Sequence, residues 1–195
     1  MYDSYPASKS KIMNNNCWYT YSPKLNKDII ITSNQEYNYW LLLEIDLDVE
    51  LFVIRPVVLN IPKKYSPQFL VRTVDGVEKN VFLRYKENQG STNIYKCNNS
   101  LVITNEYVEH NESMIALAKF ILPYLGKSPN ETDVYIILKF LKNRQKVNVN
   151  NLIKNISNLA PTRIQRATFH LILKGKINSN IKLINDINKL EVWVH

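Results

Sequence analysis

The 195-residue chain is poor in the residue types on which several common functional sites depend. Its four glycines are scattered and form no Gly-rich phosphate loop of the Walker or Rossmann type. Its two cysteines, Cys17 and Cys97, lack a C-x-x-C spacing, which argues against a structural zinc site and against a disulfide framework. The three histidines, His110, His170 and His195, lack the spacing of metal ligands. These absences disfavour nucleotide-loop enzymes, zinc proteins and disulfide-stabilised domains.

Long apolar runs are also missing. No run approaches the roughly 20 apolar residues that a membrane-spanning helix needs. The first residues, MYDSYPASKSKIMNNN, lack the apolar core of a signal peptide. We therefore expect a globular cytoplasmic protein with no membrane partner, and we expect residues 1–16 to be disordered.

Charge is the first positive indication of function. The formal net charge is +8 and the isoelectric point is about 9.3. A basic surface attracts polyanions, so this charge favours nucleic-acid binding. The chain is also rich in Asn, Lys and Ile, which AT-rich codons encode, so genome composition is an alternative source of part of the excess.

The residue pattern divides the chain near residue 126. Residues 17–126 read as mixed strands and helices, and residues 127–195 read as short helices followed by wing-like strands. Gly126, Ser128, Pro129 and Asn130 form a plausible linker between them. We predict an α/β domain, with helices flanking a mixed sheet, followed by a small and mostly helical domain.

Two local signals in the first part are specific. Ser33, followed three residues later by Glu36, predicts a capped helix that runs through YNYWLLLEI. Asp75-Gly76 between QFLVRTV and KNVFLRY predicts a β-hairpin, because both turn residues tolerate positive φ. A strand and a helix then follow in LVITNEYVEHNESMIALAKFILPYL, and Pro123 should kink or end that helix.

The order of these segments resembles the TnsA-type transposon endonucleases of the restriction-endonuclease-like, PD-(D/E)-x-K superfamily. The resemblance covers roughly residues 17–125 and rests on YSPKLNKDIIITSNQE, LEIDLDVELFVIRPVVLNI, YSPQF with VFLRYK, and LVITNEYVEHNESMIALAKFILPYL. It implies a restriction-endonuclease-like sheet and a winged-helix-like C-terminal domain. In that family a helix glutamate, an aspartate after proline and a strand Glu or Gln bind divalent cations, and a lysine positions or activates water. The corresponding residues here are Glu36, Gln68, Arg84 and Lys86, of which only the first and last match.

The two departures alter the metal chemistry. Mg²⁺ prefers carboxylate oxygens in octahedral geometry, and phosphodiester hydrolysis uses it to activate water. Gln68 removes a negative charge and Arg84 adds a positive one. At about 4 Å and an effective dielectric near 20, each unit charge changes the energy of the ion by several kcal/mol. We therefore expect no metal and no cofactor, with Mg²⁺ required only if the site is active, and we predict that Arg84 pairs with Glu36.

Each of these residues also has a purely structural interpretation. Glu36 is explained by helix capping, Gln68 by its position at the start of a strand, and Arg84 and Lys86 by solvation at a strand end. An acidic run that could suggest a metal is more simply a set of solvated loop charges, comprising Glu44, Asp46, Asp48 and Glu50.

The C-terminal part contains a candidate DNA-binding helix. It begins near Pro161, and Ile164, Ala167 and Leu171 form its core-facing stripe. A basic stripe on the third helix of such a domain is where contacts to DNA are made, although a solvated amphipathic face is an equal alternative. The candidate residues are Arg163, Arg166, His170, Lys174 and Lys176.

The resemblance implies a component of a heteromeric DNA transposition system. Because the metal-binding positions have changed, we expect an inactive nuclease fold that binds DNA and docks the transposase subunit or the ATPase regulator. One alternative is an active endonuclease with a rearranged site that uses Glu44 or Asp75. A second alternative is a winged-helix DNA-binding regulator unrelated to transposition.

Overall fold

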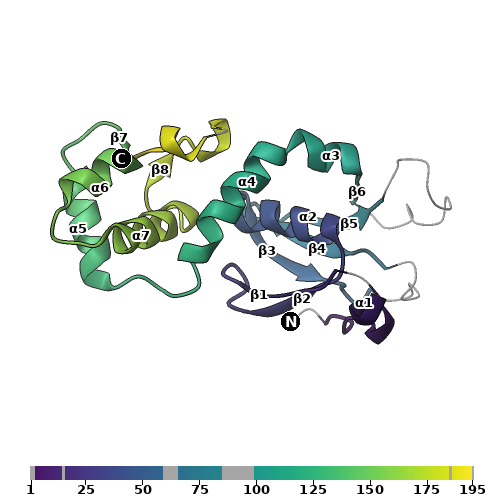
Figure 1. Ribbon diagram of the computed structural model, residues 1–195. Coiled ribbons are helices and arrows are strands. Elements are labelled where there is room, and N and C mark those ends of the chain that lie inside the picture. The colour runs from purple at the N-terminus through teal and green to yellow at the C-terminus, as the bar shows by residue number, and fades with distance from the viewer. Residues whose placement is uncertain (1–2, 15, 59–65, 85–98, 185, 195) are drawn as a thin grey trace. The chain divides into compact units, whose positions relative to one another are not determined.

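Figure 1 shows the computed structural model, which describes residues 3–14, 16–58, 66–84, 99–184 and 186–194. The chain forms two compact units, Met1–Glu112 (unit 1) and Ser113–His195 (unit 2). The sequence pattern predicts a division near residue 126, whereas the first compact unit ends at Glu112 and the second begins at Ser113. The helix that follows Glu112 therefore groups with the C-terminal residues. Among the helices in the described ranges, none is long and apolar enough to cross a membrane.

A four-stranded mixed sheet forms the centre of unit 1. Its order is β3 (Val49–Ile54), β4 (Phe69–Thr73), β5 (Glu78–Leu83) and β6 (Ser100–Ile103). The first three strands are antiparallel and β6 runs parallel to β5. The paired ends of β3, β4 and β5 are apolar and buried. The predicted mixed α/β class is confirmed.

The predicted hairpin is confirmed as β4 and β5. Arg72 pairs with Glu78, and the residues between the strands form the turn. Gly76 has φ +83°, which a residue with a Cβ adopts only with strain, and its N–H donates to Thr73 O at 2.9 Å. The Asp-Gly signal thus fixes the register of this strand pair.

The predicted capped helix is α2 (Asn34–Ile45), which lies along the sheet (Figure 1). Ser33 Oγ accepts the Glu36 N–H at 3.1 Å, as the capping interpretation requires. The helix is buried around most of its circumference, including Trp40, Leu41 and Leu43. This burial follows from the nearly continuous apolar residues of the helix.

A second hairpin and two short helices make up the rest of the described part of unit 1. The hairpin of β1 (Trp18–Ser22) and β2 (Lys27–Ile31) precedes α2, and α3 (Asn105–His110) follows the sheet. In the segment that we expected to be disordered, residues 3–14 carry α1 (Lys9–Asn14), and Ser4 bridges to Pro56. A backbone pairing that the sequence does not signal thus ties this segment to the end of β3.

Unit 2 is a helical region with a small sheet. Pro123 acts as predicted, since α4 (Glu112–Ile121) ends two residues before it and passes into a 3₁₀ turn, η3 (Leu122–Tyr124). The later helices are α5 (Glu131–Leu141), α6 (Val149–Asn155) and α7 (Pro161–Leu173). The remaining elements are β7 (Val147–Asn148), β8 (Asn178–Ser179), η4 (Ile181–Leu183), η5 (Ile187–Lys189) and β9 (Glu191–Trp193), and the strands form an antiparallel sheet of order β7-β9-β8.

Candidate functional site

Glu36 lies in the first turn of α2 and is 3% exposed. Its Oε1 accepts a hydrogen bond from Arg55 Nη1 at 3.0 Å. Its Oε2 accepts from Thr32 N at 2.6 Å and from Thr32 Oγ1 at 3.0 Å. In a capping box the glutamate returns to the N-cap N–H, but here it reaches one residue further back. Both carboxylate oxygens are therefore satisfied within the protein.

Arg55 is the cationic partner of Glu36, and the sequence reasoning missed it. It follows β3, precedes Pro56 and has φ +53°, in the left-handed region that non-glycine residues rarely adopt. Its Nη2 donates to Ile30 O at 2.7 Å. A charge in an otherwise apolar strand end requires an opposite charge nearby, and that requirement was the signal available in the sequence.

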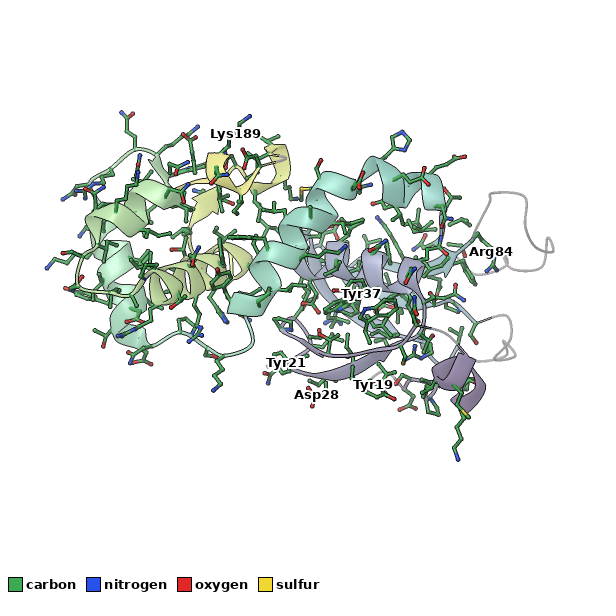
Figure 2. The ribbon with its side chains drawn as sticks, in the orientation of Figure 1. Tyr19, Tyr21, Asp28, Tyr37, Arg84 and Lys189 are labelled. Atoms are coloured by element: carbon green, nitrogen blue, oxygen red, sulfur yellow. The ribbon has the colours of Figure 1, made fainter. Side chains whose placement is uncertain are left out.

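Arg84 does not fill the role that we predicted for it. Its Nη1 donates to Leu83 O at 3.0 Å, and its guanidinium carbon lies 5.9 Å from the centroid of the Phe82 ring. Arg84 itself is labelled in Figure 2. The salt bridge of Glu36 is with Arg55 instead. A guanidinium does neutralise the helix glutamate, but it comes from the end of β3 rather than from β5. Lys86 lies outside the described residues.

Gln68 joins the neighbouring strands at this end of the sheet. Its Oε1 accepts the Leu83 N–H at 2.7 Å, so the side chain supplies a backbone-like contact just before β4 begins. The backbone carbonyl oxygen of Gln68 accepts the backbone N–H of Arg55 at 2.7 Å. Gln68 is thus more than a polar residue at a strand start, since it holds Arg55 and the end of β5 in place.

Gln35 completes the connection between α2 and the sheet. Its Nε2 donates to Arg84 O at 2.7 Å and to Ile103 O at 3.2 Å. Glu36, Gln68 and Arg84 therefore lie at the same end of the sheet, linked through Arg55 and Gln35. These residues therefore lie near one another, although the predicted ion pair between Glu36 and Arg84 does not form.

The side chains described at this end of the sheet are unlike those of a divalent-cation site. In the described ranges no group of three or more His, Cys, Asp or Glu side chains could hold a metal ion. A cation approaching Glu36 would meet the positive guanidinium of Arg55 at close range, and like charges repel strongly where water is excluded. The Glu36–Arg55 pair, together with Gln68, can therefore support the fold but supplies no ligand set for Mg²⁺.

The interpretation of the acidic run as solvated loop charges is wrong for Glu44, which lies in α2 and is 1% exposed. Its carboxylate accepts from Ser22 Oγ, from Trp40 Nε1 at 2.8 Å and from Lys24 N at 3.0 Å. Burial raises the pKa of Glu44, and these hydrogen bonds oppose that effect. Glu50, further along the run, pairs with Arg72 at 2.8 Å.

Glu44 and Asp75 lie too far from Glu36 to form a rearranged metal site with it. Glu44 is eight positions further along α2, which corresponds to roughly 12 Å of helix rise. Asp75 lies in the turn after the five-residue strand β4, roughly 17 Å from the Gln68 end, and accepts from Thr73 Oγ1. Asp75 thus belongs to the turn, as its sequence position indicates.

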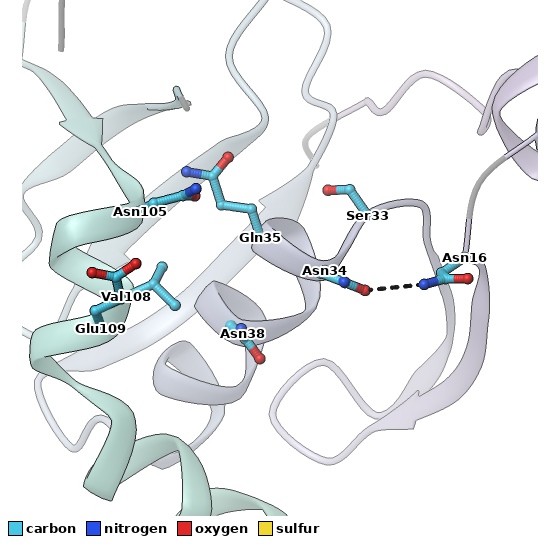
Figure 3. A pocket seen from close by; sticks show the side chains of 8 residues that line it. All are labelled: Asn16, Ser33, Asn34, Gln35, Asn38, Asn105, Val108 and Glu109. Atoms are coloured by element: carbon cyan, nitrogen blue, oxygen red, sulfur yellow. Dashed lines mark hydrogen bonds between the residues drawn. The ribbon is translucent and has the colours of Figure 1, made fainter. Parts of the chain in front are cut away.

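A polar pocket opens beside the first turn of α2 (Figure 3). Its volume is about 590 Å³. Side-chain amides dominate its lining, and Asn16 Nδ2 lies 3.5 Å from Asn34 Oδ1. Amides can donate and accept hydrogen bonds, but the lining contains no basic side chain to hold a phosphate. Its residues are Asn16, Ser33, Asn34, Gln35, Asn38, Asn105, Val108 and Glu109.

Arg163, the first candidate DNA-binding residue on α7, forms an ion pair within unit 2. Its Nε and Nη2 donate to Asp133 Oδ2 at 2.9 Å and to Asp133 Oδ1 at 2.5 Å. The carboxylate is 4% exposed, whereas the arginine side chain is 47% exposed. This bidentate pair joins α7 to α5 and stabilises a buried carboxylate.

The other α7 candidates do not share one exposed face. Arg166 and His170 are half-buried, and Arg166 Nε and His170 Nε2 are buried atoms with no hydrogen-bond partner in the described residues. Burial lowers the pKa of His170, and contacts with the backbone of Lys127 and Leu125 oppose that effect. Lys174 and Lys176 are exposed just beyond the end of the helix.

The basic charge of the chain belongs to unit 2. Residues 113–195 contain 13 Lys and Arg against four Asp and Glu, a net charge of +9, whereas residues 1–112 contain 12 against 13, a net charge of −1. Counting charge separately for the two parts of the sequence would have revealed this asymmetry. The excess positive charge from which we predicted nucleic-acid binding therefore lies in unit 2.

No model of a known protein family matches the chain, and no curated protein matches it.

Proposed function

We propose that the chain is a TnsA-like component of a heteromeric DNA transposition system. It is an inactive nuclease fold that binds DNA and docks the transposase subunit or the ATPase regulator. Unit 1 is the nuclease-like scaffold, and unit 2 provides the affinity for DNA.

The observation that carries this proposal is the Glu36–Arg55 ion pair. In the resembled family the helix glutamate binds a divalent cation, and here that glutamate is buried against a guanidinium at 3.0 Å. Gln68, at the position of the metal-binding aspartate, uses its side-chain oxygen for the Leu83 N–H. Both groups serve the fold, so a scaffold without cleavage is the function that this geometry supports best.

The arrangement of elements supports the same proposal. In unit 1 the helix bearing the glutamate precedes three antiparallel strands and a parallel fourth strand, which is compatible with a restriction-endonuclease-like sheet. Unit 2 has the order α5, β7, α6, α7, β8, β9 with a three-stranded antiparallel sheet, which is compatible with a winged-helix-like domain. The net charge of +9 in unit 2 favours DNA as its partner.

Cleavage and binding should be measured on the same preparation of the full chain. We expect a duplex DNA to be bound, and supercoiled plasmid to remain uncut with either Mg²⁺ or Mn²⁺. Plasmid nicking by the wild type that disappears in Glu36→Gln would overturn the inactive scaffold and favour an active endonuclease. A folded chain that binds no DNA would remove the DNA-binding role.

The cause of inactivity can be tested by reversing the two changes that the structure identifies. The double variant Arg55→Gln/Gln68→Asp removes the guanidinium and restores one carboxylate. We expect it to bind Mn²⁺ more tightly than the wild type in a titration followed by electron paramagnetic resonance. Arg72→Gln, which removes a partly exposed arginine paired with Glu50, is the control and should not change Mn²⁺ binding.

The docking role needs a separate experiment. We expect the full chain to co-elute with the transposase subunit or the ATPase regulator of the same transposon when the proteins are produced together. DNA binding without either association would instead favour the winged-helix regulator.

A further inference from the structure

The end of α5 and the turn that follows it carry the densest group of cations in unit 2. The α5 basic cluster consists of Lys139, Lys142, Arg144 and Lys146, all of which are exposed. Four of eight successive residues are therefore cationic, and this stretch contains no acidic residue. None of the salt bridges in the described residues involves these four side chains. Their charge is available to a partner.

Three aromatic rings lie beneath these cations. Lys139 Nζ is 5.9 Å from the Tyr135 ring centroid, the Arg144 guanidinium carbon is 3.8 Å from that of Phe140, and Lys146 Nζ is 4.9 Å from that of Trp193. A ring face attracts a cation and limits its movement, so less side-chain freedom remains to be lost on binding. The cations are held at the surface without being neutralised.

The elements of unit 2 explain how these residues come together. The buried residues of α5 recur on one side of the helix: Asp133, Ile137 and Leu141. Tyr135, Lys139 and Lys142 therefore lie on the exposed side. β7 pairs with β9 through Val147 and Val192, and this pairing brings the residue before β7 beside Trp193. Long-range pairing thus extends the cluster from one helix to a surface of two segments.

We propose that unit 2 binds the phosphate backbone of duplex DNA through the α5 basic cluster rather than through the basic stripe of α7. This inference rests on the DNA binding of the proposed function and names the surface responsible. Along α5, Lys139 and Lys142 are separated by about 4.5 Å of helix rise, comparable with the roughly 3.4 Å axial spacing of phosphates along one DNA strand. On α7, by contrast, Arg163 forms an ion pair with Asp133, and Arg166 and His170 are half-buried.

Stabilisation of the helix explains only part of the cluster. Lys139 and Lys142 lie at the C-terminal end of α5, where cations interact favourably with the helix dipole. Arg144 Nη1 donates to Phe140 O at 2.5 Å, which satisfies a carbonyl of the last turn. Lys146 has no such role, and its Nζ lies over an aromatic ring beyond the helix. The charge density therefore exceeds what the helix end requires.

Two matched double variants of the full chain test the surface. Lys142→Gln/Lys146→Gln removes two exposed cations from the cluster. Lys174→Gln/Lys176→Gln removes two exposed cations just after α7 and changes the net charge equally. Equal melting temperatures would show that both variants fold. Binding to one short duplex is then followed between about 0.05 and 0.2 M salt, where each lost phosphate contact lowers the slope of log K against log salt by about 0.9.

We expect the cluster variant to bind at least about tenfold more weakly and its salt slope to fall by about 2, whereas the control changes little. Equal weakening of both variants, or weakening of the control alone, would overturn the α5 surface and leave the proposed DNA binding intact. A wild type that binds no duplex would overturn both.

Discussion

Arg55 Nη1 lies 3.0 Å from Glu36 Oε1, and the two side chains are 19% and 4% exposed. The pair joins the first turn of α2 to the residue that follows β3, so it connects a helix to the sheet beneath it. Removing either partner leaves the other charge in a site from which water is largely excluded. The pair therefore stabilises unit 1 and places a positive charge beside the Glu36 carboxylate.

Replacing Arg55 should destabilise unit 1. Arg55→Gln leaves the Glu36 carboxylate buried without its cation, and we expect a loss of about 3 kcal/mol in the free energy of unfolding, because a partly exposed pair falls at the low end of the buried range. Denaturant-dependent hydrogen exchange, which resolves the two units, measures this loss. Glu36→Gln/Arg55→Gln should lose less than the sum of the single variants.

The exposed Lys27→Gln is the control for this cycle and should change stability by less than about 0.5 kcal/mol. Additive losses from Glu36→Gln and Arg55→Gln would mean that the two side chains do not interact and would contradict the ion pair.

Local signals predicted the elements around this pair. Ser33 starts α2 because its side chain can cap an N–H three residues later, and Gly76 turns the hairpin because it adopts positive φ without strain. Both effects depend on a few neighbouring residues, so sequence alone was sufficient. Pro123, which ends α4, belongs to the same class.

The contacts within the candidate site depend on residues distant in sequence, and these were predicted less well. Position in the resembled motif favoured Arg84 as the partner of Glu36, but which cation meets the carboxylate depends on how β3 and α2 pack. Glu44 looked like a loop charge because it stands among other acidic residues. Ser22 and Lys24, which satisfy it, come from the preceding hairpin.

The turn of the central hairpin gives a second stability test. Gly76 has φ +83°, and no atom lies within 4 Å of the position that a Cβ would take. Gly76→Ala should therefore destabilise unit 1 through backbone strain alone, by about 1 kcal/mol. Gly126→Ala, at a glycine whose φ is not in the left-handed range and which also has open space, is the matched control. Equal stability of Gly76→Ala and the wild type would contradict the turn geometry.

Glu44 should make unit 1 less stable as the pH rises. Burial raises its pKa in the folded state, so the folded protein binds a proton more readily than the unfolded chain does. The stabilisation is complete below the ordinary glutamate pKa and is lost as the pH rises through the raised folded value. Hydrogen exchange of unit 1, corrected for the intrinsic pH dependence of exchange, should show this trend.

Glu44→Gln removes the titrating group and should flatten that trend. The exposed Glu109→Gln, also in unit 1, should leave it unchanged. If Glu44→Gln and the wild type had the same pH dependence, another group would be responsible.

His170 should give unit 2 the opposite pH dependence. Burial lowers its pKa, with Lys174 and Arg166 acting in the same direction, so the unfolded chain binds the proton more readily. The stability that His170 contributes to unit 2 is fully present above the ordinary histidine pKa of about 6.5. It is lost as the pH falls through the lowered pKa of His170 in the folded state. We expect His170→Gln to reduce the loss of unit 2 stability between neutral and mildly acidic pH. His110→Gln, in unit 1, should have no effect on it.

The ion pair between Arg163 and Asp133 separates a structural role of Arg163 from a DNA-binding role. Asp133 is 4% exposed and Arg163 is 47% exposed, so the carboxylate depends on the pair more than the guanidinium does. Arg163→Gln should therefore destabilise unit 2 more than Asp133→Asn, because it leaves a buried charge without a partner, whereas the freed arginine can be hydrated. Thermal unfolding compares the two variants directly.

Asp133→Asn also tests whether Arg163 contacts DNA, because it frees the guanidinium at the surface of α7. If the ion pair kept Arg163 from binding DNA, the affinity of Asp133→Asn for duplex DNA would rise by more than the loss of one negative charge explains. Asp186→Asn, which removes the same charge elsewhere in unit 2, supplies that reference. We expect the two variants to bind duplex DNA equally, because we propose that Arg163 supports the fold of unit 2 and that the α5 basic cluster contacts the phosphates.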